Sequence, residues 1–140
     1  MEVILLDKEI QTEIVNFLTK KVSPYVVYLF GSKVKGTANN NSDIDIAYLS
    51  VQDIDEYENF MLAQELAGII NNDVDLIDLN KASTVFQGQI VSTGKTIYCS
   101  DNKKRMEYEM KALKMYAKLN EERKYIIDNV QESGTVFYEE

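Results

Sequence analysis

The first half of the chain changes from a helical to a strand-like pattern of apolar residues. Residues about 7–22 carry apolar side chains at helical spacing, which predicts an amphipathic helix. Pro24 ends this pattern, and the apolar, β-prone run over 25–30 is typical of a buried strand. Polar residues over 31–42 indicate a loop, and the alternation over 43–49 predicts a second strand.

The second half continues the alternation of helices and strands and ends in a longer helix. Helical spacing predicts helices over about 53–71, 82–92 and 101–131, and β-prone runs predict strands over 73–79 and 95–98. The helix over 53–71 is expected to bury one apolar stripe. The stripe consists of Ile54, Tyr57, Met61, Leu66, Ile69 and Ile70.

The order of these elements indicates the fold class. Helix, strand, loop, strand, helix, strand, helix, strand and helix predict an α/β or α+β domain, with a small mixed β-sheet flanked by helices. A chain of 140 residues suffices for one domain but not for two. We therefore expect residues 1–140 to form a single domain. Within it, about 101–140 would be a long C-terminal helix and tail, and a candidate partner-docking segment.

The composition of the chain excludes several kinds of binding and catalytic site. The formal net charge of −8 argues against a protein that coats nucleic acid, so no direct nucleic-acid contact is expected. The sequence has no histidine, which excludes a Ser-His-Asp triad, an imidazole base and a His-ligated zinc site. Any bound metal should therefore be a hard cation held by carboxylates.

The sequence also favours a cytoplasmic protein. Cys99 is the only cysteine, so no intrachain disulfide can form, which fits a reducing compartment. The apolar run at residues 3–6 is too short for a signal peptide. No stretch approaches the roughly 20 apolar residues that span a bilayer, so no membrane contact is expected.

Two short motifs flank the predicted loop. Gly31 and Ser32 close the first strand, and Asp43 and Asp45 open the second. A glycine lets the backbone approach phosphate oxygens, and Ser32 offers them a backbone N–H and a hydroxyl. Asp43 and Asp45, at i and i+2 of a strand, project from one face and repel each other unless cations lie between them. The pair therefore predicts a Mg²⁺ site that shares the phosphates of a nucleotide.

A third carboxylate is expected from the next predicted strand. Asp73, Asp75 and Asp78 are the candidates. Asp75 is preferred because it lies inside the strand between apolar neighbours, whereas Asp73 adjoins a turn. With Asp43 and Asp45 it would complete a site in which two metal ions clamp the attacking and leaving oxygens. Asp75 can also accept the proton of the incoming hydroxyl.

These motifs belong to a longer family signature. Residues 29–47 read Leu-Phe-Gly-Ser-Lys-Val-Lys-Gly-Thr-Ala-Asn-Asn-Asn-Ser-Asp-Ile-Asp-Ile-Ala. This run resembles the signature of the minimal nucleotidyltransferases in the DNA-polymerase-β-like superfamily. More narrowly, the chain is similar to the MntA-type antitoxins of HEPN/MNT toxin–antitoxin pairs. That likeness extends to residues 74–79, 90–98 and 116–124, and so spans nearly the whole chain.

The resemblance implies a polymerase-β-like nucleotidyltransferase fold and a nucleotide site at the end of the first strand. Gly31 and Ser32 would bind the triphosphate of ATP, and Lys33 is a further candidate for a phosphate contact. The chain departs from the family in one respect, because Lys33 and Lys35 stand where members often carry arginine. Lysine attracts a phosphate as a point charge but cannot bind it bidentately.

The resemblance also implies a reaction. Asp43, Asp45 and Asp75 would hold two Mg²⁺ ions and serve as the catalytic acids. The chain would then transfer AMP from ATP to a hydroxyl, expected to be a tyrosine's, of a cognate HEPN RNase toxin, and so neutralise the toxin.

Two other functions stay open at this point. The acidic charge and the long C-terminal helix also fit an antitoxin that masks its toxin sterically, without catalysis. The third hypothesis is a nucleotidyltransferase that modifies a small molecule. A chain of 140 residues has little room for a dedicated substrate domain, so such an enzyme would borrow one from a partner.

Overall fold

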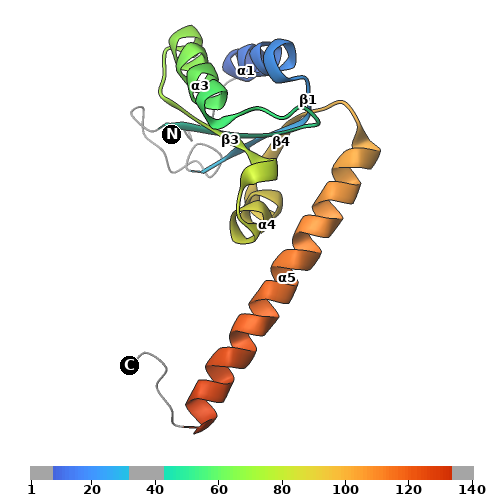
Figure 1. The fold of residues 1–140 in the computed structure, drawn as a ribbon. Coiled ribbons are helices and arrows are strands. Elements are labelled where there is room, and N and C mark those ends of the chain that lie inside the picture. Colours follow the sequence, from blue (N-terminus) through green and yellow to red (C-terminus); the bar gives the residue numbers. More distant parts are fainter. Residues whose placement is uncertain (1–7, 32–42, 134–140) are drawn as a thin grey trace, which may run out of the picture.

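In the part of the chain that the structure describes, residues 8–31 and 43–133, a four-stranded sheet carries helices on both faces (Figure 1). The structure is a computed structural model. Its elements, in chain order, are α1 Lys8–Val22, β1 Pro24–Phe30, β2 Ile44–Ser50, α3 Glu56–Ile70, β3 Val74–Asp78, the 3₁₀-helix η1 Leu79–Lys81, α4 Thr84–Thr93, β4 Lys95–Cys99 and α5 Asn102–Ser133.

The sheet is mixed, as the sequence predicts. Its strand order is β3-β2-β1-β4, in which β2 pairs antiparallel with β1 and parallel with β3, and β1 pairs antiparallel with β4. Parallel neighbours need a long crossover, and α3 supplies it between β2 and β3. This order leaves β3 at one edge of the sheet and places β2 between β3 and β1.

Alternation along the strands divides the apolar side chains between two cores. On the face covered by α1 and α3, Ile44 and Ile46 of β2 pack with Leu18 and Leu66. On the opposite face, covered by α4 and the start of α5, the alternate strand residues pack with Ile90. Successive strand residues point to opposite faces, so membership of a core shows which face each neighbouring polar residue occupies.

The buried face of α3 differs from the predicted stripe. Tyr57, Met61 and Ile69 are exposed, whereas the apolar pattern of the sequence predicts that they are buried. The inward face instead includes Asn59, whose side chain accepts a hydrogen bond from the Tyr48 hydroxyl (2.7 Å) and donates one to the Leu76 carbonyl (2.8 Å). The prediction was wrong because a polar residue with satisfied hydrogen bonds takes an inward position that the apolar pattern does not reveal.

The long C-terminal helix is confirmed, and Figure 1 shows it running away from the sheet beyond α4. Its first half is anchored. The Tyr108 hydroxyl donates to Gln87 Oε1 on α4 (2.6 Å), and the Tyr116 ring lies where a side chain at Gly88 would be. Among the described residues, no helix combines the length and apolar character needed to cross a bilayer.

Candidate active site

Three acidic residues lie where β2 and β3 begin. Asp45 of β2 stands opposite Asp75 of β3 in the parallel register. Asp43 precedes the first residue of β2 by one position. The structure therefore places the three acids predicted from the sequence at the starts of two neighbouring strands, while their roles stay a prediction.

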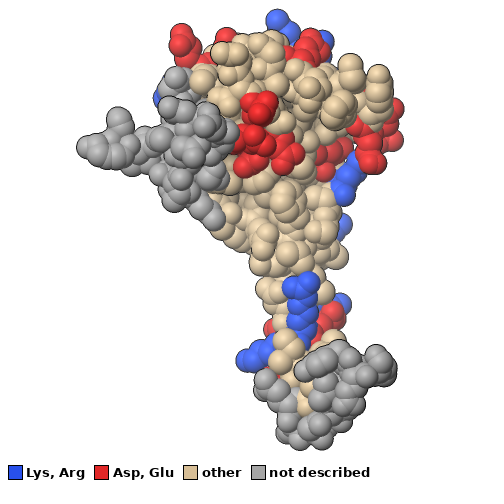
Figure 2. Space-filling model, turned by 90° about the vertical axis from the view of Figure 1, so that its left-hand side faces the viewer, with Lys and Arg blue, Asp and Glu red and all other residues tan. Residues whose placement is uncertain are grey.

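Asp45 and Asp75 share the sheet face that carries α4. Ala47, two residues beyond Asp45, belongs to the core on that side, and so does Ile77, two residues beyond Asp75. Because side chains alternate along a strand, Asp45 and Asp75 point to the same face. Figure 2 shows acidic side chains gathered in the middle of the globular body.

Gly31 sits directly against this group. It follows β1 with a φ of +82°, a left-handed conformation that favours glycine. A Cβ at this position would lie 2.1 Å from Asp45 Oδ2, well inside van der Waals contact. Phe30, just before it, pairs in register with Asp45, and its ring meets Phe86 of α4 edge to face at 5.6 Å. The glycine thus permits a close approach of the β1 end to the acidic group.

The electrostatics of the site centre on Asp45. Burial raises the pKa of its carboxyl to about 6, and the charges of Asp75 and then Asp43 add to the increase. The carboxylate at position 45 is thus held against two like charges, which costs free energy as long as no cation lies among them.

The raised pKa of Asp45 predicts how stability depends on pH. An unfolded aspartate has a pKa of about 3.9, so the folded protein binds this proton more tightly. The contribution of Asp45 to the free energy of unfolding is therefore fully present below about pH 4 and is lost as the pH rises to about 6. Urea unfolding at several pH values, with a chelator present, measures this contribution to the free energy of unfolding. Asp45→Asn should flatten this part of the profile, and identical profiles would contradict the assignment.

The donor set suits a hard divalent cation. Carboxylate oxygens are the ligands that Mg²⁺ prefers, and a cation would relieve the repulsion that raises the pKa of Asp45. Within residues 8–31 and 43–133, no three acidic or cysteine side chains are gathered tightly enough to surround a metal ion. The residues fit such an ion by chemistry and by register, and their carboxylates would have to draw closer to bind it.

The other residues that the sequence suggested for the site are not part of this acidic group in the described structure. Ser32, Lys33 and Lys35 lie outside the described residues. Asp73 is exposed and precedes β3, and its backbone carbonyl accepts from the Ile44 N–H (2.9 Å). Asp78 caps η1 by accepting from the Asn80 N–H (3.1 Å).

One feature of the site was not found from the sequence. A groove along the outer edge of β3 has Asp75 in its lining, together with residues of α3 and α4. The only hint of this groove in the sequence was Phe60, an apolar residue of α3 that is not part of the predicted apolar stripe. It did not identify the groove, because nothing in the sequence says that β3 is an edge strand.

Comparison with known proteins gives a family match over most of the chain. Residues 12–103 match the family model described as polymerase beta, nucleotidyltransferase. A protein adenylyltransferase MntA of Shewanella oneidensis (strain MR-1) is 43% identical over 105 residues, which are 75% of each chain.

Solved structures extend the likeness to the fold. A crystal structure of a toxin–antitoxin with AMP-PNP contains a chain that is 38% identical, with a TM-score of 0.77 over 86% of this chain and 98% of the other. A second structure holds a tri-AMPylated HEPN toxin of Shewanella oneidensis in complex with its MNT antitoxin. The matching chain is 34% identical, with a TM-score of 0.75 over 90% of this chain and 99% of the other.

Proposed function

Because this chain belongs to the polymerase β nucleotidyltransferase family, we propose that it is an antitoxin that transfers AMP from ATP to a HEPN RNase toxin. The accepting group is a hydroxyl, expected to be that of a tyrosine, and the modification neutralises the toxin. The AMP-PNP and the AMPylated toxin found with related chains support this reaction.

One observation of the structure carries the proposal. Asp75 stands in register with Asp45, and the charges of both Asp75 and Asp43 raise the pKa of the Asp45 carboxyl. An antitoxin that only masks its toxin has no need to hold like charges together at a cost in stability. The acidic group is therefore better explained by catalysis.

The proposed reaction is an in-line displacement at the α-phosphorus of ATP. The acceptor oxygen forms a bond to that phosphorus, the bond to the bridging oxygen breaks, and pyrophosphate leaves. Asp75 accepts the proton of the acceptor hydroxyl, and Gly31 lets the phosphates approach the backbone. Asp43, Asp45 and Asp75 would hold Mg²⁺, two ions in our proposal, which would neutralise the charge that develops on the phosphates.

We also propose that the long helix α5 binds the toxin and that the reaction takes place in the cytoplasm. Beyond its contacts with α4, α5 carries exposed apolar side chains, among them Tyr125, Ile126 and Ile127. They would dock the toxin and hold it beside the acids. The reaction would take place in the cytoplasm, where the lone Cys99 stays reduced.

A mass measurement tests the proposed function. The purified protein is incubated with its toxin, ATP and Mg²⁺, and the toxin's mass is followed. We expect increments of one AMP each and a parallel loss of RNase activity. Neutralisation of the bound toxin without any mass change would contradict catalysis and favour steric masking.

A further inference from the structure

A groove of about 690 Å³ runs along the outer edge of β3. This volume lies within the range of about 300–1,000 Å³ that is usual for ligand sites. Helix α3 lines one side with Glu56 and Phe60, and the start of α4 lines the other with Phe86. Residues 74–78 of β3 lie between them.

The groove is continuous with the acidic group. Asp75 belongs to both, since it lines the groove and stands opposite Asp45. The strand order places the groove on the β3 side of Asp45 and Gly31 on the β1 side. In an in-line displacement, the entering and leaving groups lie on opposite sides of the phosphorus. With the phosphates against Gly31, the acceptor therefore enters from the groove.

We propose that this groove binds the toxin segment that carries the accepting hydroxyl, and that the segment is extended and has basic and apolar side chains. The inference rests on the proposed function. It identifies the site at which the toxin is bound and the kind of side chains that the site recognises.

Apolar surface in the groove calls for an apolar side chain from the segment. Phe60 is 57% exposed although it lines the groove, and the partly buried Phe86 lines it too. Burial of such a ring against a partner stabilises the complex, because aromatic side chains remove a large apolar area from water.

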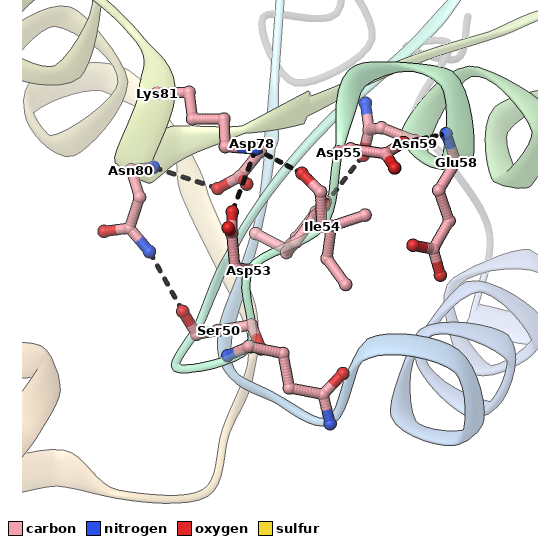
Figure 3. Close-up of polar contacts among 11 residues, drawn as sticks. Ser50, Asp53, Ile54, Asp55, Glu58, Asn59, Asp78, Asn80 and Lys81 are labelled. Atoms are coloured by element: carbon pink, nitrogen blue, oxygen red, sulfur yellow. Dashed lines mark hydrogen bonds and ion pairs between the residues drawn. The ribbon is translucent and has the colours of Figure 1, made fainter.

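The charges in the groove favour a basic partner. Glu56, Asp75 and Asp78 are acidic lining residues. Lys81, which also lines the groove, is already engaged: its Nζ lies 3.2 Å from Asp53 Oδ1 and donates to the Ile54 carbonyl (Figure 3). Glu56, which takes no part in the proposed metal site or in the cap of η1, is therefore left to complement a lysine or arginine side chain of the segment.

The edge of β3 favours an extended segment that is held mainly by its side chains. An edge strand offers its backbone to a neighbouring chain. Here the Leu76 carbonyl already accepts a hydrogen bond from the Asn59 side chain of α3 (2.8 Å). A fully paired fifth strand is thus disfavoured, and the segment lies beside β3 and reaches Asp75 at one end.

Steady-state AMP transfer to the toxin, with ATP affinity measured separately, tests the groove. Phe60→Glu should raise the KM for the toxin by about tenfold or more, as loss of a buried aromatic contact does at other interfaces, and leave the affinity for ATP unchanged. Tyr57→Glu is the matched control, because Tyr57 lies on the same helix, is 73% exposed and is not among the lining residues. Glu56→Lys should also raise the KM for the toxin, whereas Glu58→Lys should leave this KM unchanged.

A cross-link locates the segment directly. A photoreactive phenylalanine analogue at position 60 should capture the toxin fragment that also carries AMP, and the same analogue at position 57 should not. Capture of a remote fragment, or transfer with an unchanged KM in Phe60→Glu, would overturn this inference alone. Absence of AMP transfer by the unmodified protein would overturn the proposed function and this inference with it.

Discussion

Asp45→Asn should reduce AMP transfer to the toxin by at least about a thousandfold, on the order of 4 kcal/mol in the activation barrier. Asp45 is the acid on which the charges of both other acids act, and an amide in its place removes one negative charge of the proposed metal site. Transfer is measured by the mass of the toxin and by label from radioactive ATP.

Stability separates this loss of function from misfolding. The carboxylate of Asp45 is opposed by the charges of Asp75 and Asp43, so Asp45→Asn should leave the free energy of unfolding at pH 7 unchanged or higher. Asp73→Asn is the control, because Asp73 is exposed and precedes β3. Transfer that persists in Asp45→Asn, or that is lost equally in Asp73→Asn, would be incompatible with the proposed site.

Gly31→Ala should reduce transfer by about a hundredfold, because a misplacement of about 1 Å at a reacting centre has an effect of that size. The new Cβ would lie 2.1 Å from Asp45 Oδ2, so either the Asp45 carboxylate or the end of β1 has to move. The left-handed backbone, with a φ of +82°, adds a cost of about 1–2 kcal/mol for alanine.

Gly68→Ala is the matched control for this substitution. Gly68 lies in α3, and a Cβ there meets nothing within 4 Å. It should keep full transfer and gain about 0.5–1 kcal/mol of stability from the better helix former. Kinetics and urea unfolding of both variants give the comparison. Full activity in Gly31→Ala would show that the close approach of β1 to Asp45 has no part in the reaction.

The sequence predicts the acidic group well because strand periodicity is a local property. Asp43 and Asp45 are two residues apart in one strand, and Asp75 lies inside another, so alternation places each on a definite face. That β2 and β3 are neighbours also follows, because a strand, a helix and a strand in sequence form a parallel pair by a standard crossover.

Other features depend on contacts that are distant in sequence. Asn59 is an inward residue of α3 because Tyr48 and Leu76 satisfy its amide, and no pattern within the helix reveals those partners. The groove exists because β3 is an edge strand, which only the whole strand order determines. The second half of α5 is likewise exposed because α4 covers only the first half, and this packing cannot be predicted from the sequence of α5 alone.

The positions of divalent ions test the central claim most directly. In crystals of the protein with Mn²⁺ and a non-hydrolysable ATP analogue, the anomalous signal locates the metal. We predict Mn²⁺ bound to carboxylate oxygens of Asp43, Asp45 and Asp75, with the triphosphate against Gly31. Mn²⁺ and triphosphate bound elsewhere, with Asp75 turned away from Asp45, would contradict the account.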